Sequence, residues 1–178
     1  NLADNQIALP YEGEGRRMSV PVAFANGTIE LDTIQMMLDT GATYTTLPTT
    51  VLEELGIAPG PEDPVIHLHT ANGERTAKVV LVDHVWLGDL RLDGVAIATC
   101  DGCSSADTAG LLGLNVTSGF NLSIDADRHE VVFTERKAIN RHLDVKPLSD
   151  VSASVTRFPG GRVEVEVRLE NRSRREII

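Results

Sequence analysis

The feature of this sequence that most limits its possible folds is the shortness of its apolar stretches, which turn residues interrupt throughout. The longest of these stretches have about six residues, whereas a membrane-spanning helix needs roughly 20. Two Asn-Gly pairs, Asn26-Gly27 and Asn72-Gly73, each lie between two apolar segments. An Asn-Gly pair in that position is the strongest short-range signal for a β-hairpin. The sequence therefore predicts a mainly β chain with no transmembrane segment.

Short strands account for most of the predicted structure. Their expected positions are residues 17–25, 28–38, 65–71, 74–82, 85–87, 90–99, 120–124 and 130–133. The apolar alternation changes phase inside the second strand, which predicts a β-bulge near Asp32-Thr33. One short helix is expected over Thr50–Leu55, because Thr50 and Glu53 have capping-box spacing and Gly56 can end it. Many short strands with Gly-rich turns favour a barrel or a sandwich.

The composition narrows the class of protein further. A length of 178 residues allows one domain, or one domain with a short appendage. Because only 4% of the residues are aromatic, we expect an aliphatic core, with Trp86, Leu87, Leu90 and Leu92 inside it. The net charge of −10 argues against nucleic-acid binding, which needs a basic surface.

Two pairs of potential metal ligands are weak signals for a metal site. Cys100 and Cys103 form a C-x-x-C pair in a polar loop, without the second ligand pair of a zinc site or the helix start of a thioredoxin-like motif. We expect two loop cysteines, joined by a local disulfide if the compartment is oxidising. His67 and His69 share one face of a predicted strand, but no third ligand has suitable spacing, so no metal site is expected.

The clearest chemical signal is the segment Asp39-Thr40-Gly41-Ala42, which directly follows an apolar strand. Gly41 permits a tight turn that brings the backbone close to the Asp39 carboxylate. Backbone N–H groups in such a turn can bond an ionised carboxylate, and Thr40 adds a hydroxyl that can hold the loop. Asp-x-Gly is also common in ordinary turns, so a purely structural Asp39 is the simpler alternative.

This segment resembles the Asp-Thr-Gly-Ala signature of aspartic proteases, specifically the retropepsin-like kind. Other elements of that family follow in the same order. Met37-Leu38 are the two hydrophobic residues before the Asp, residues 69–73 match a flap hairpin, and Leu111-Leu112-Gly113 match the strand behind the catalytic loop. Leu114-Asn115-Val116 occupy the place of a short helix.

The resemblance covers about residues 17–134 and is greater to bacterial members than to viral ones, which end near the helix. It implies a closed acid-protease β-barrel with one lobe per chain. It also implies that Thr40, Gly41 and Ala42 form the active-site loop around the catalytic Asp39. No cofactor is implied.

Two further groups of residues receive roles from the same resemblance. The flap residues would close over a peptide substrate; they are Thr70, Ala71, Asn72 and Gly73. The strand Leu111-Leu112-Gly113 would support the active site.

The number of catalytic motifs then determines the expected assembly. Aspartic protease chemistry uses two carboxylates that share a proton around one water. This chain has a single Asp-Thr-Gly, so Asp39 of two chains would meet in a C2 homodimer. One carboxylate would act as general base towards the water, and the protonated one would bond the oxyanion. The alternative is a retropepsin-like dimerisation or peptide-binding module without catalysis, since fold does not imply function.

The expected domain organisation has three parts. Residues 1–16 form an N-terminal segment, residues 17–135 form the protease domain, and residues 136–178 form a linker and a C-terminal β-hairpin. The last 28 residues hold 6 Lys and Arg and 4 Asp and Glu, in contrast to the acidic body, which supports a boundary here. This extension is interpreted either as support for the dimer or flap, or as the start of a second, truncated domain.

The start at Asn1 favours a processed or trimmed chain. Because relatives are often associated with the cell envelope, a periplasmic or membrane-tethered location is expected.

Overall fold

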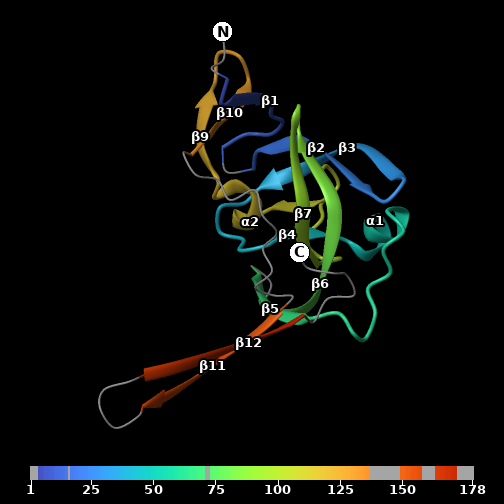
Figure 1. Cartoon of the computed structure of the whole chain (residues 1–178). Coiled ribbons are helices and arrows are strands. Elements are labelled where there is room, and N and C mark those ends of the chain that lie inside the picture. The colour runs from blue at the N-terminus through green and yellow to red at the C-terminus, as the bar shows by residue number, and fades with distance from the viewer. Residues whose placement is uncertain (1–3, 16, 71–72, 137–148, 158–162, 172–178) are drawn as a thin grey trace.

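The computed structural model describes residues 4–15, 17–70, 73–136, 149–157 and 163–171. The chain is mainly β, as the sequence predicts (Figure 1). Its described strands are β1 (Gln6–Pro10), β2 (Ser19–Asn26), β3 (Ile29–Leu38), β4 (Thr45–Leu47), β5 (Val65–Thr70), β6 (Gly73–Leu87), β7 (Leu90–Thr99), β8 (Gly110–Leu112), β9 (Phe120–Asp125), β10 (Glu130–Glu135), β11 (Ser149–Arg157) and β12 (Val163–Asn171). Its described helices are α1 (Thr49–Glu54) and α2 (Leu114–Thr117).

A nearly closed barrel forms the body of the molecule. Its strands follow the order β4-β7-β6-β2-β3-β8, and β5 pairs with β6 outside this path. β3 runs parallel to β8, and β4 runs parallel to β7. The two ends of the path lie side by side, because the Leu111 N–H of β8 donates to Thr46 Oγ1 of β4 (3.1 Å). The closed β-barrel that the sequence predicts is therefore confirmed.

The β2–β3 hairpin contains the predicted bulge. Val22 pairs with Ile34, and Phe24 pairs with Leu31. Asp32-Thr33 of β3 therefore face a single residue of β2, which is the definition of a β-bulge. The change of phase in the sequence correctly located this irregularity.

β6 is one strand of 15 residues that belongs to both the β5–β6 hairpin and the barrel. The sequence predicts separate strands at 74–82 and 85–87, and this division is wrong. Residues 73–78 pair with β5, and residues 79–87 pair with β7. Because β6 is paired with β5 or β7 along its length, its backbone stays extended from one end to the other.

A second, three-stranded sheet has the order β1-β10-β9. The predicted hairpin of β9 and β10 is confirmed, with Glu130 paired to Asp125 beside the turn. β1 was not predicted, because five residues ending in Pro10 show too little alternation to stand out. It pairs with β10 along its whole length, from Gln6–Thr134 to Pro10–Glu130. The division of the chain at residue 16 stays a prediction.

Helix α1 begins one residue earlier than predicted, and its predicted capping box is wrong. Pro48 is the N-cap, and no side chain of the helix caps it. The carboxylate of Asp101, from the loop after β7, accepts a hydrogen bond from the Thr49 N–H (2.7 Å). A distant acidic residue thus satisfies a free N–H that the local sequence was expected to bond. Gly56 ends the helix as predicted, with φ +73°.

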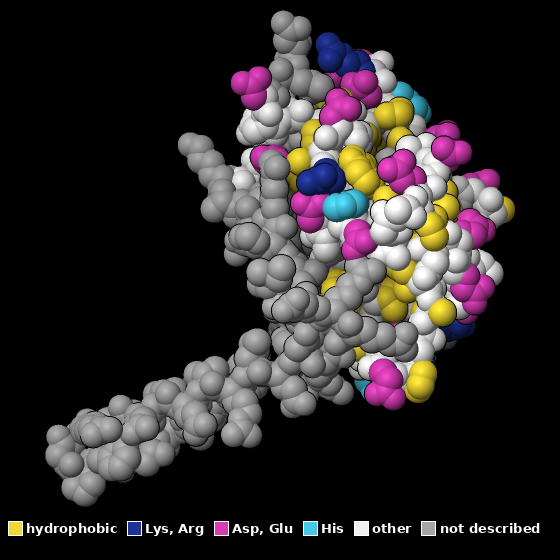
Figure 2. All heavy atoms as spheres, turned by 45° about the vertical axis from the view of Figure 1, so that its right-hand side comes forward, with side chains coloured by type: hydrophobic (Ala, Val, Ile, Leu, Met, Phe, Trp, Pro, Cys, Tyr) yellow, Lys and Arg dark blue, Asp and Glu magenta, His cyan; other side chains and the backbone are white. Residues whose placement is uncertain are grey.

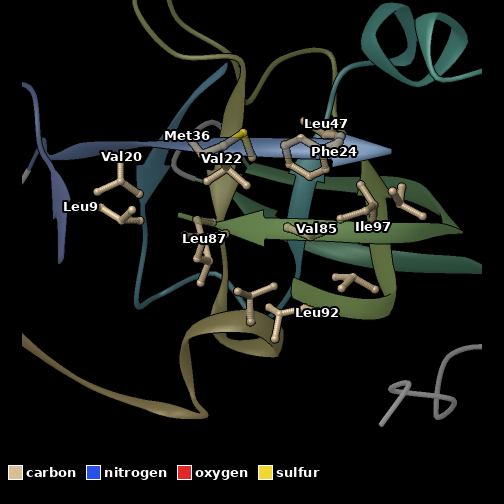
Figure 3. Packing of buried hydrophobic residues seen from close by; sticks show 14 of the residues in the cluster. Leu9, Val20, Val22, Phe24, Met36, Leu47, Val85, Leu87, Leu92 and Ile97 are labelled. Carbon is tan, nitrogen blue, oxygen red and sulfur yellow. The ribbon is translucent and has the colours of Figure 1, made fainter. Parts of the chain in front are cut away.

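The core is aliphatic, apart from the three phenylalanines Phe24, Phe120 and Phe133. Figure 3 shows Phe24 among aliphatic side chains of the barrel. The largest fully buried side chains are Phe24, Phe133, Met36, Leu47, Leu52, Leu55, Leu87, Ile97, Leu112, Val20 and Val22.

Trp86 is not part of this core, contrary to the prediction. It is half-buried and lies edge-on to the ring of His84, with centroids 5.4 Å apart. Leu87 follows it directly and is fully buried. Successive residues of a strand point to opposite faces, so the two side chains cannot both enter the core.

The C-terminal hairpin is confirmed. β11 and β12 pair with each other in antiparallel register and with no other described strand. Figure 1 draws them apart from the barrel. The burial of their side chains and nearly all of the predicted linker lie outside the described residues.

No helix in the described part of the chain is long and apolar enough to cross a bilayer.

Truncation of a core ring tests this packing. Phe24 is 0% exposed, so we expect Phe24→Ala to lower the free energy of unfolding by about 3–5 kcal/mol. Val65 is 58% exposed, so Val65→Ala should change it by less than about 0.5 kcal/mol. Urea unfolding at a fixed protein concentration measures both values. Equal losses would contradict the placement of Phe24 in the core.

Candidate active site

Asp39 lies at the end of β3, where two neighbouring segments hold the backbone. The Asp39 N–H donates to Leu112 O of the parallel strand β8 (3.2 Å), and the Leu38 N–H donates to Met18 O (2.8 Å). These bonds continue the sheet up to the aspartate itself. The carboxylate is therefore carried by a rigid strand end.

The loop after β3 folds back onto the Asp39 carboxylate. The Gly41 N–H donates to Asp39 Oδ1 (2.8 Å), and the Ala42 N–H donates to Asp39 O (3.2 Å). A Cβ on Gly41 would lie 3.1 Å from Oδ1, so a side chain there would crowd the carboxylate. Within the described residues Oδ2 accepts no hydrogen bond, and Asp39 is half-buried. One carboxylate oxygen is thus held, and the other is free to bond a water or a partner.

Thr40 is exposed, and its hydroxyl has no hydrogen-bond partner in the described part of the chain. The sequence suggested that it holds the loop. Within one chain, the bonds of Gly41 and Ala42 do this instead.

The strand Leu111-Leu112-Gly113 passes directly behind this loop, where the resemblance places it. Leu111 pairs with Met37 and Leu112 with Leu38. A Cβ on Gly113 would lie 2.4 Å from the carbonyl carbon of Tyr44, and one on Gly110 would lie 2.1 Å from Thr46 O. Only glycine fits at these two points of backbone contact.

A buried network joins β4, β8 and α2 beneath the loop, and the sequence analysis missed its central residue, Thr45. Thr45 is fully buried. Its N–H and its hydroxyl both donate to Asn115 Oδ1 (2.7 and 2.9 Å), and its Oγ1 accepts from the Gly113 N–H (3.1 Å). Asn115 Nδ2 donates to Ala96 O of β7 (2.8 Å). Two polar residues inside a buried segment, Thr45-Thr46, were the available signal for this network.

Helix α2 is bonded to the active-site loop through the backbone. The Leu114 N–H donates to Ala42 O (2.8 Å), and the Asn115 N–H donates to Thr43 O (3.0 Å). The helix is only four residues long. Its position therefore depends on these bonds and on the Asn115 side chain.

A pocket of about 390 Å³ opens beside Gly41 and Ala42. Besides the active-site loop and Thr46 of β4, its walls come from β5, β8 and the loop after β7. The residues from these last three segments are His67, Leu68, Leu111 and Cys103. The pocket is of a size that holds one side chain or a small ligand.

A second hollow, of about 820 Å³, lies next to the segment before β2, with Glu12, Glu14 and Arg17 in its lining. Met37 lines it together with the loop 105–108.

The expected flap corresponds to the β5–β6 hairpin. Thr70 and Gly73 pair at its end, while Ala71 and Asn72 lie outside the described residues. His67 is exposed, and its Nδ1 lies 3.9 Å from Glu74 Oε1. The side chain of His69 also lies outside the described residues.

Cys100 and Cys103 are joined by a disulfide, with their Cα atoms 5.4 Å apart. Among the described residues, no group of three or more His, Cys, Asp or Glu side chains is placed to hold a metal ion.

A nearly closed β-barrel with an aspartate at a strand end, followed two residues later by a glycine that bonds its carboxylate, is an arrangement of the aspartic-protease type. A family model described as aspartyl protease matches residues 20–116, which is more than half of the chain. The chain belongs to the aspartyl protease family, a family of hydrolases.

The chain is also similar to two solved structures. The chain is similar to a retropepsin-like aspartic protease from Rickettsia conorii, with 23% identity, 73% of this chain and 90% of that chain covered, and a TM-score of 0.53. This likeness shows a shared fold. It is also similar to an aspartic proteinase from Irpex lacteus, with 12% identity, 87% and 53% coverage and a TM-score of 0.47. No curated protein matches the chain.

The buried network can be tested at Thr45. Thr45→Val keeps the shape of the side chain but leaves the Gly113 N–H without its acceptor, so we expect a loss of about 1–3 kcal/mol of stability. Thr43 is exposed, and the same substitution there, Thr43→Val, should cost less than about 0.5 kcal/mol. Thermal unfolding of both variants measures the difference. A Thr45→Val protein as stable as wild type would show that the network contributes nothing.

Proposed function

We propose that this protein is an aspartic endopeptidase in which Asp39 of two identical chains forms one catalytic dyad. The observation that carries the proposal is the loop geometry. Asp39 ends a rigid strand, one carboxylate oxygen accepts the Gly41 N–H, and the other accepts no bond among the described residues. Since the chain contains one Asp-Thr-Gly, the second carboxylate has to come from a partner.

The proposed reaction begins with one ionised and one protonated Asp39. Two carboxylates in close contact cannot both be ionised, so the pair holds one proton. The ionised Asp39 removes a proton from a water, and the water oxygen bonds to the peptide carbonyl carbon. The protonated Asp39 of the other chain donates to the carbonyl oxygen as negative charge develops there. A proton then passes to the amide nitrogen, and the C–N bond breaks.

Exposed residues around the loop support the dimer. Thr40 and Gly41 are exposed, although they adjoin the proposed catalytic group. Leu114, whose N–H is bonded to the loop, is 38% exposed. A C2 partner that brings its own Asp39 to this place would cover all three. In that position the Thr40 hydroxyl, without a described partner in its own chain, would donate across the dyad.

The proposed substrate is an extended peptide lying between the active-site loop and the β5–β6 hairpin. The pocket beside Gly41 and Ala42 would receive one of its side chains. Figure 2 shows Asp and Glu side chains spread over the visible face and few Lys and Arg. With a net charge of −10, neutral or basic peptides would be favoured over acidic ones.

We also propose an oxidising compartment such as the periplasm. The Cys100–Cys103 disulfide supports this location, because disulfides persist in oxidising compartments and are rare in the cytosol.

Substitution of the aspartate tests the catalytic role. Asp39→Asn keeps the size of the side chain but removes the general base, so we expect peptide cleavage at about pH 4 to 7 to fall by at least 10²–10⁴-fold. Asp127→Asn, in the exposed turn between β9 and β10, should keep wild-type activity. Cleavage of a peptide library by the three proteins provides the measurement. Equal activity of Asp39→Asn and wild type would refute the proposal, and a wild type that binds peptides without cleaving them would favour the non-catalytic alternative.

Mixed dimers test whether the site is shared. Wild type and Asp39→Asn are unfolded and refolded together in equal amounts, so that chains pair at random. Only about a quarter of the dimers then carry two Asp39 residues, and activity should fall to roughly a quarter of that of the same total amount of wild type. Sites confined to single chains would instead retain about half. Sedimentation of the mixture confirms that the species measured is a dimer.

A further inference from the structure

The Cys100–Cys103 disulfide occupies an unusual place, in the wall of the pocket beside the active-site loop. Cys103 lines this pocket together with Ala42, Leu111 and His67. Neither the resemblance nor the proposed mechanism gives the disulfide a role. The disulfide nevertheless brings a reactive sulfur atom, that of Cys103, into the pocket proposed to bind a substrate side chain.

The two sulfur atoms differ in access. Cys100 is 5% exposed, and its N–H donates to Leu47 O at the end of β4 (2.9 Å). Cys103 is half-exposed, and the residues on both sides of it are exposed. An incoming thiolate can therefore reach Cys103 Sγ, whereas the barrel encloses Cys100.

The turn between the two cysteines is held independently of the disulfide. The Cys103 N–H donates to Cys100 O (3.2 Å), and the Asp101 carboxylate accepts from the Thr49 N–H (2.7 Å). Arg75 of β6 packs on the same turn, because a Cβ on Gly102 would lie 2.7 Å from its guanidinium. Opening of the disulfide should therefore leave Cys103 in the pocket wall and Cys100 beside it.

We propose that Cys103 is a site of reversible thiol modification within the substrate pocket. The proposal rests on the proposed function, because it takes the pocket to be part of the substrate site. The thiolate of a small thiol, such as a cysteine-containing peptide, attacks Cys103 Sγ. The Cys100–Cys103 bond breaks, a new disulfide joins Cys103 to the small thiol, and Cys100 leaves as a thiolate that takes a proton. One disulfide replaces another, so no separate oxidant or reductant is needed.

The adduct would block the pocket, and the enclosed Cys100 would reverse it. A pocket of about 390 Å³ is near the lower end of small-molecule sites, so a tripeptide thiol would fill most of it. Attack of the Cys100 thiolate on Cys103 Sγ would release the small thiol and restore the wall. Because the turn holds both residues close together, this return step is intramolecular and hence favoured.

Two single variants test the proposal as a matched pair. Cys100→Ser leaves Cys103 as a free thiol, and Cys103→Ser leaves Cys100. Each is treated with oxidised glutathione and with a methanethiosulfonate, and intact mass follows the adduct. We expect Cys103 to react at least about 10-fold faster than Cys100, because thiol reaction requires access. A non-cleavable extended peptide should slow the reaction of Cys103 and not that of Cys100.

The activity of each modified variant is compared with that of the same variant before modification. We expect the glutathione adduct on Cys103 to lower kcat/KM by about 10-fold or more, the methylthio adduct to lower it less, and dithiothreitol to restore it. An adduct on Cys103 that leaves kcat/KM unchanged would overturn the proposal. So would equal reaction rates of the two cysteines.

The outcomes of these two experiments distinguish a failure of the modification site from a failure of the proposed proteolytic function. If no form of the protein cleaves peptides but bound peptide still protects Cys103, the proteolytic function fails and the modification site stands. If the unmodified proteins cleave and the adduct has no effect, only the modification site fails. Should Cys100→Ser not fold, Cys100→Ala, which puts no polar group at this buried position, is treated with oxidised glutathione in the same way. The adduct on Cys103 and the fall in kcat/KM must then appear together.

Discussion

The close backbone contact between β8 and β4 is the constraint on which the rest of this structure depends. At Gly110 and Gly113 there is no room for a Cβ, and between these points β8 pairs in parallel with β3. This contact nearly closes the barrel, and it places Leu112 O where it accepts the Asp39 N–H. Thr45 then satisfies the Gly113 N–H inside the protein. The fold and the position of the loop around Asp39 therefore depend on the same few bonds, and a change that separates the strands would disturb both.

The strands of the barrel and the position of Asp39 after a strand could be predicted, because the signals for both are local in the sequence. Asn-Gly pairs mark hairpins, a change of alternation marks the bulge at Asp32-Thr33, and Asp39 follows directly after an apolar strand. The helix boundary failed for the opposite reason. Asp101 lies about 50 residues from Thr49 in the chain, and nothing in the local sequence shows that its carboxylate will complete the first turn. The role of Thr45 was missed for the same reason, because its partners come from β8 and α2.

Burial also depends on neighbours that a single strand does not reveal. Trp86 was expected inside the core, yet the side chain of Leu87 points into the core and the indole of Trp86 lies against His84. The pocket is a similar case. The C-x-x-C pair indicated only a loop, and the position of Cys103 beside Ala42 emerges once the end of β7 is brought to the active-site loop. The neighbours of Trp86 and Cys103 come from distant parts of the sequence, and the spacing of residues along the chain does not predict them.

The continuity of β6 has a mechanical consequence for the hairpin. The same strand forms one side of the β5–β6 hairpin and then passes into the barrel, where β2 and β7 pair with it. There is no loop at the base of the hairpin on this side, and thus no point at which it could swing as a separate body. Any displacement of its outer end has to be accommodated by elastic bending and twisting along the strand. The outer end of the hairpin is therefore expected to move by gradual bending of β6, while the barrel holds the other end of this strand in place.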